Sequence, residues 1–207
     1  MSAKILAVVE RRTRANEGAA PWTTTPLPAS TFVRLSGDTD DQEIGAVVWQ
    51  LTCYNRLGTA EPLRSASTAD HFVLPGGLAF EDDAGRLITP GCCAGLETWR
   101  EWSSVPADGG SPWMGHDPAP WVEEKGEILR VWADGGLSAL KPGELHIDFR
   151  RDELAFQLRR VEGDLQAFLV RLEAWVNSVD PAVTAAFASR FDQMFQITRE
   201  GSRPRVA

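Results

Sequence analysis

Apolar residues recur at helical spacing over the last quarter of the chain. They predict one long helix from about Arg151 to Val179, followed at Asp180-Pro181 by a second, shorter helix through residues 185–195. So apolar a stripe is not stable alone in water, and we expect it to pack on a sheet or on a second copy of the chain. The stripe of the long helix contains Leu154, Leu158, Val161, Leu165, Phe168, Leu169, Leu172, Trp175, Val176 and Val179.

Apolar and polar residues alternate in several shorter stretches, which is typical of half-buried strands. Two pairs of such stretches are joined by turn residues and predict hairpins, whose strands are antiparallel. The predicted strands are 4–10, 31–35, 77–81 with 86–89 across the turn 82–85, 121–124 with 127–132 across the turn 125–126, and 144–149.

Residues 39–57 contain a third helical signal. Cap residues and acids from Thr39 to Glu43 suit a helix N-terminus, and apolar residues then recur at helical spacing as far as Leu57. Gly58 stands where a left-handed terminator is expected. The β-branched pair at 47–48 also suits a strand, so residues 42–57 keep strand as the alternative to the favoured helix.

These elements predict an α+β fold with a small antiparallel sheet built from hairpins. The sheet packs against the long C-terminal helix and the shorter helix that follows it. We expect a single domain over residues 1–200, with a proline-rich loop at 11–29 and a disordered tail at 201–207.

The formal net charge of −8 narrows the classes of partner. It argues against a nucleic-acid backbone, which needs a basic face, and it permits a basic protein partner. No apolar run is long enough to span a membrane. The short apolar run after Lys4 is followed at once by Glu10 and two arginines, so we interpret it as a strand and expect a cytoplasmic protein.

Cys92 and Cys93 carry the first candidate chemistry. They lie between Gly91 and Gly95 and precede a short amphipathic stretch that reaches Trp102, so we expect a turn that opens a short helix. A thiol at a helix N-terminus is a better nucleophile, because the helix dipole favours its thiolate. His116 and Asp117, in a proline-rich loop, are the matching candidates for a base and its partner. The structural alternative, buried thiols in a tight turn, is favoured because free cysteine is mostly buried.

Metal binding by the same residues is not expected. Structural zinc sites prefer cysteines two to four residues apart, and the side chains of adjacent cysteines are expected to diverge. The chain also lacks phosphate-loop, dinucleotide, serine-elbow and zinc motifs, so we expect no metal and no other cofactor.

Five of the eight tryptophans lie between Trp99 and Trp132, which indicates either a core or a recognition surface. Most are expected in the core, and one or two at the surface. The candidate binding residues are Trp99, Trp102, Trp113, His116 and Trp121.

These residues are compatible with three functions. We favour a cytoplasmic binding or accessory protein that acts through a protein–protein surface and resembles an immunity protein in type only. The first alternative is a cysteine-dependent enzyme that uses Cys92 or Cys93 with His116. The second is a small-molecule binder with a pocket between the 91–95 turn and the 113–121 loop. The oligomeric state is open, with a homodimer among the alternatives.

Overall fold

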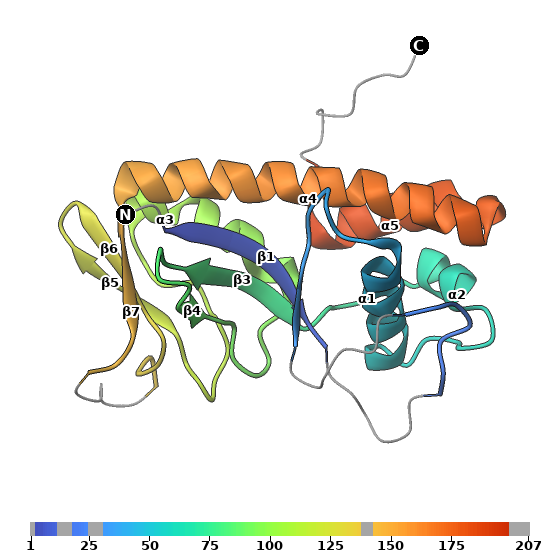
Figure 1. Cartoon of the computed structure of the whole chain (residues 1–207), viewed down its shortest axis with the longest axis horizontal. Helices are drawn as coiled ribbons and strands as arrows, with labels where there is room; N and C mark the ends of the chain where they lie inside the picture. The colour runs from blue at the N-terminus through green and yellow to red at the C-terminus, as the bar shows by residue number, and fades with distance from the viewer. Residues whose placement is uncertain (1–2, 12–17, 25–30, 138–142, 199–207) are drawn as a thin grey trace, which may run out of the picture.

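The computed structural model describes residues 3–11, 18–24, 31–137 and 143–198. The long helix is the axis of the molecule, and the strands and shorter helices line its length (Figure 1). In chain order the elements are β1 (Lys4–Glu10), β2 (Phe32–Arg34), α1 (Asp41–Tyr54), α2 (Pro62–Thr68), β3 (Gly76–Glu81), β4 (Leu87–Ile88), the 3₁₀ helix η1 (Leu96–Ser103), α3 (Val105–Asp108), β5 (Trp121–Lys125), β6 (Ile128–Trp132), β7 (His146–Arg150), α4 (Arg151–Val179), the 3₁₀ turn η2 (Pro181–Val183) and α5 (Thr184–Phe195).

The α+β class and the antiparallel pairing of the strands are confirmed. The expected single sheet is instead two sheets within the described residues, one of four strands in the order β2-β1-β3-β4 and one of three in the order β5-β6-β7. The reason is long-range pairing. The first predicted hairpin adds to β1 from the N-terminus, whereas the second adds to β7 just before α4.

Helix α4 has the predicted bounds, Arg151–Val179. It packs on β7 near its N-terminal end, then on β1, and then on α1 and α5, so one helix covers elements of both sheets (Figure 1). Val179, which the pattern placed in the stripe, is exposed at the end of the helix. The buried residues of the helix are Leu154, Gln157, Leu158, Val161, Leu165, Phe168, Leu172, Trp175 and Val176.

The helix expected at 42–57 is α1, and its N-terminus follows the predicted chemistry. The side chain of Asp40 accepts hydrogen bonds from the backbone N–H groups of Gln42 and Glu43, and Glu43 bonds back to the N–H of Asp40. The C-terminal prediction was wrong. The helix ends at Tyr54, and Arg56 rather than Gly58 takes the left-handed conformation, with φ of 54°.

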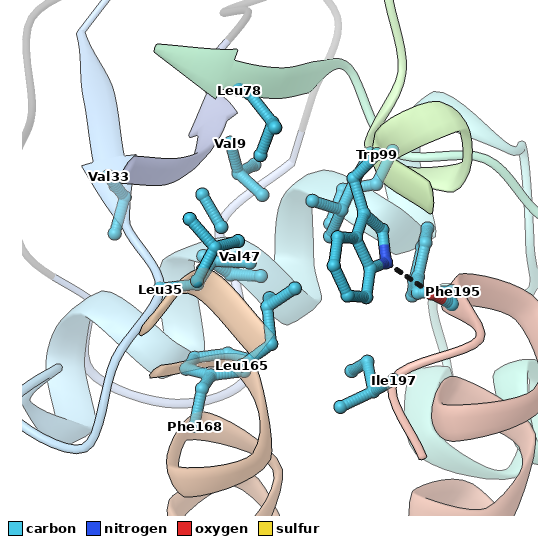
Figure 2. Packing of buried hydrophobic residues seen from close by; sticks show 14 of the residues in the cluster. Val9, Val33, Leu35, Val47, Leu78, Trp99, Leu165, Phe168, Phe195 and Ile197 are labelled. Atoms are coloured by element: carbon cyan, nitrogen blue, oxygen red, sulfur yellow. Dashed lines mark hydrogen bonds between the residues drawn. The ribbon is translucent and has the colours of Figure 1, made fainter. Parts of the chain in front are cut away.

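The hydrophobic core is continuous from the four-stranded sheet to the C-terminal helices. Figure 2 shows Val9 and Leu78 of the sheet, Val47 of α1 and Leu165 of α4 around one interior. Residue Trp99 lies in this interior, and its indole N–H donates to the carbonyl oxygen of Phe195 at 2.7 Å (Figure 2). Because the indole N–H is satisfied, its burial leaves no unpaired donor.

The proline-rich loop at 11–29 is described only in part. Trp22 packs edge-on against Trp175 and donates its indole N–H to the carbonyl oxygen of Gly45, so this part of the loop is held against α1 and α4. The predicted tail at 201–207 lies outside the described residues. Among the described helices, none combines the length and the apolar character that a membrane crossing requires.

Candidate functional site at the Cys92–Cys93 turn

Two segments far apart in sequence meet at the cysteine pair. Cys92 and His116 form an antiparallel bridge in which each backbone N–H donates to the other carbonyl oxygen, at 2.7 Å and 3.0 Å. The N–H of Gly91 donates to the carbonyl oxygen of Met114 at 2.7 Å. We call residues 91–93 and 114–117 the Cys–His junction.

Glycine is required where the two segments cross. A Cβ at Gly91 would collide with the carbonyl oxygen of Pro118, and a Cβ at Gly115 would lie against the backbone of residues 91 and 92. Gly115 also has a φ of 95°, which an L side chain rarely adopts. The glycines thus permit a backbone-to-backbone contact that larger residues would prevent.

The cysteines do not open a helix, which corrects the sequence interpretation. The helix is the 3₁₀ helix η1, and it begins only at Leu96, after the N-cap Gly95. The N–H of Cys92 is committed to His116, and the N–H of Leu96 to Leu74. Long-range pairing has therefore moved the helix start away from the thiols, and the helix-dipole argument for a reactive thiol loses its basis.

The two sulfur atoms lie close together, whereas adjacent cysteines were expected to diverge. The Sγ atoms are 3.6 Å apart, and one ligand atom each from Cys92, Cys93 and His116 lies within 4.8 Å of the other two. Cys93 is exposed, and Cys92 and His116 are partly buried. The structure therefore brings the predicted thiol and imidazole candidates into one cluster at the surface.

Asp117 lies beside His116, as the predicted pairing of base and carboxylate requires. Its Oδ2 is 3.4 Å from Nδ1 of His116, and the carboxylate side chain is 96% exposed. The Asp117 backbone is left-handed, with φ of 53°. Aspartate tolerates this conformation better than most side chains do.

Two of the candidate binding tryptophans belong to the core. Trp99 and Trp102 are 2% and 3% exposed. They share the inner face of η1, where Trp102 packs on Phe80 and Trp99 bonds to Phe195. Helix η1 contacts β1, β3 and α5, so both rings lie in the hydrophobic core rather than on a recognition surface.

The other two candidates, Trp113 and Trp121, line a surface cavity of about 420 Å³. Its lining also includes Gly135, Gly136 and Leu137, whereas the 91–95 turn contributes no lining residue. Trp113 is 46% exposed and Leu137 is 67% exposed. The indole Nε1 of Trp121 is buried without a hydrogen-bond partner among the described residues.

Sequence reasoning missed the 135–137 wall. Two hydrogen bonds connect this segment with the tryptophan loop. The N–H of Gly136 donates to the carbonyl oxygen of Ala119, and the N–H of Ala119 donates to the side-chain Oδ1 of the preceding Asp134, both at 2.9 Å. A Gly-Gly pair after a strand is a turn signal that carries no information about its partner. The apolar Leu137 next to this pair was the one signal in the sequence that could have indicated a binding surface here.

We compared the chain with protein-family models, with curated proteins and with solved structures, and none of the three comparisons finds a match.

Proposed function

We propose that the protein is a cytoplasmic binding protein that receives an apolar side chain of a protein partner in the cavity beside Trp113. The observation that carries the proposal is that an exposed Trp113 and an exposed Leu137 line the same surface cavity of about 420 Å³. It is immunity-like in type only, as a small acidic accessory protein.

The chemistry of the cavity favours a protein anchor. Interface energy is concentrated in a few residues that fill desolvated pockets, and tryptophan is enriched among them. Trp113 is the one tryptophan of the described chain that counts among its exposed large hydrophobic residues. An exposed tryptophan presents apolar surface to water. A partner that covers this surface gains free energy from its burial.

Charge supports a partner with basic residues around the anchor. The whole chain carries −8, and Asp117, whose side chain is 96% exposed, stands two residues from the cavity-lining Gly115. A negative rim speeds association with a basic surface, and salt screens that effect. We therefore expect partner binding to slow as the salt concentration rises.

A photo-cross-linking experiment in the native host tests the proposal. A photoreactive phenylalanine analogue replaces Leu137 in one variant and Val170 in the other, since both residues are exposed and Val170 lies on α4, away from the cavity. We expect a discrete cross-linked partner from position 137 and none from position 170. Adding Trp113→Ala to the first variant should abolish the product.

The cross-linked mass separates the competing occupants. A product of twice the mass of this chain identifies a second copy and replaces the heteromeric partner with a homodimer. Equal products from both positions, or a product that survives Trp113→Ala, would contradict the proposal. A small ligand that co-purifies with the wild type and is lost from Trp113→Ala would instead support the small-molecule alternative, because the cavity volume lies in the range of ligand pockets.

A cysteine-dependent enzyme is the second candidate, and one observation favours it: His116 lies beside both sulfurs. A nucleophile needs a base within reach, and the base an orienting group such as Asp117. Iodoacetamide labelling tests it, with Cys53 as the internal reference. Labelling of Cys92 or Cys93 much faster than Cys53, and slowed by His116→Ala, supports the enzyme; uniform rates contradict it.

A further inference from the structure

The Cys–His junction brings together three side chains that can bind a metal ion. Two thiols and one imidazole contribute ligand atoms within 4.8 Å of one another, and the sulfur–sulfur distance is 3.6 Å. Two thiolates bound to one tetrahedral zinc ion at about 2.3 Å lie roughly 3.8 Å apart. The sulfurs therefore already have almost the spacing that the ion would impose.

Backbone pairing explains why Cys92 and His116 face the same way. Residues directly opposite each other in an antiparallel bridge project their side chains to the same face. The two reciprocal hydrogen bonds between Cys92 and His116 fix this pairing, so the donors are positioned without help from a loop closure.

Cys93 joins them because its backbone leaves the extended conformation. In a continuing strand, the side chain of Cys93 would point to the face opposite Cys92. Its φ is instead 66°, in the left-handed region, and the sulfur comes back to 3.6 Å from its neighbour. A residue other than glycine in this region costs about 1–2 kcal/mol and persists where the surroundings over-determine it, most often at functional sites.

We propose that Cys92, Cys93 and His116 bind a zinc ion, with the fourth position open to solvent. Thiolate and imidazole donors are the set that zinc prefers, and hard cations such as Mg²⁺ and Ca²⁺ prefer oxygen. Cys93 is exposed, so the ion reaches the donors directly from solution. The thiols release their protons to solvent as the ion binds. The site replaces the sequence expectation of no metal, which rested on diverging side chains.

Asp117 is the positioning residue of this site. Its Oδ2 lies 3.4 Å from Nδ1 of His116, so an ion held by Nε2 leaves the Nδ1–H facing a carboxylate. Such a carboxylate orients the imidazole and raises its basicity, and removing it usually weakens the affinity for metal by about tenfold to a hundredfold.

The test uses the purified full-length protein, reduced and stripped of metal. Zn²⁺ is titrated in competition with a chromophoric chelator, and Co²⁺ is added to a second sample as a spectroscopic probe. We expect one equivalent of Zn²⁺ to bind, and the Co²⁺ sample to show thiolate-to-metal charge transfer with the intense visible bands of a tetrahedral ion.

Matched variants assign the ligands. Cys92→Ser, Cys93→Ser and His116→Ala should each weaken Zn²⁺ binding by about a hundredfold or more. This loss is larger than the one expected when a residue that only hydrogen-bonds to a ligand is replaced. Cys53→Ser is the control, because Cys53 lies in α1, outside the cluster, and should leave the affinity unchanged. Circular dichroism of each variant without metal shows that the fold is retained, so a loss of affinity is a loss of ligands.

Asp117→Asn should weaken Zn²⁺ binding by about tenfold and leave the Co²⁺ spectrum unchanged, with recovery in Asp117→Glu. The proposal is overturned if Cys92→Ser/Cys93→Ser binds Zn²⁺ as tightly as the wild type, or if the Co²⁺ spectrum lacks charge transfer. An oxidised Cys92–Cys93 pair that resists reduction, seen as a loss of two hydrogens by mass spectrometry, would also overturn it.

Discussion

Helix α4 and the Cys–His junction are stabilised in opposite ways. The helix buries nine residues along its 29 and packs on elements of both sheets and on the shorter helices. The junction is held by three short backbone hydrogen bonds, two glycines and two left-handed residues, Cys93 and Asp117. We therefore expect α4 to accept substitutions on its surface but not in its buried stripe, and the junction to depend on single backbone positions.

Leu165→Asp should have the largest effect, because it places a charge in the buried stripe of α4. Leu165 is fully buried, and an unpaired carboxylate there costs roughly 4 kcal/mol or more. We expect loss of cooperative folding by thermal denaturation. Val170→Asp, on the exposed face of α4, is the control and should melt near the wild-type temperature. A cooperative Leu165→Asp variant with an unchanged midpoint contradicts this account of the helix.

Gly91→Ala should break the junction and leave the rest of the protein folded. Its Cβ would collide with the carbonyl oxygen of Pro118, so the two segments must separate, at a cost of about 2 kcal/mol. Chemical denaturation measures the loss, and iodoacetamide labelling should report altered access to Cys92. Gly18→Ala, where an added Cβ meets nothing within 4 Å, is the control. Equal behaviour of the two variants would show that the junction does not need close contact.

Gly163→Ala should stabilise the protein, in contrast to the two substitutions above. Gly163 lies inside α4, and an added Cβ meets nothing within 4 Å. Alanine removes the entropic penalty of a helical glycine, so we expect stabilisation by about 0.5–1 kcal/mol in denaturant unfolding. A loss of stability instead would mean that the exposed face of α4 is covered.

Acidification should have the smallest effect, through a carboxylate that links the start of α4 to the loop that precedes residues 114–117 of the junction. Glu124 accepts hydrogen bonds from the backbone N–H of Gly110 and from Arg151 at the start of α4. The N–H of Gly110, and then Arg151, lower the pKa of Glu124 below its ordinary value. A carboxyl with a lowered pKa in the folded state stabilises the protein above its unfolded pKa, and this contribution is lost as the pH falls through the folded pKa.

The corresponding measurement is the free energy of unfolding from neutral pH down to about pH 3, compared between wild type and Glu124→Gln. The variant should be less stable at neutral pH, and the difference should shrink on acidification. An NMR titration of the Glu124 carboxyl group should have its midpoint below 4.5. Parallel stability curves would contradict the lowered pKa.

Elements with a local signal could be predicted from the residues alone. The 3.6-residue period of the apolar stripe defines α4 from Arg151 to Val179, because each turn of a helix repeats the same burial. The Asp40–Glu43 cap and the two hairpin turns are equally local, since their hydrogen bonds join residues only a few positions apart.

Tertiary structure alone decided the sheets and the candidate site. Whether a hairpin joins β1 or β7 depends on strands far apart in the chain, and no local period encodes that choice. The residue types at the junction were visible in the sequence, but their convergence comes from the bridge between residues 24 positions apart and from the left-handed Cys93. The contribution of Leu137 to the cavity could not be predicted for the same reason. The sequence of a loop identifies its apolar residues but not the distant residues that they approach.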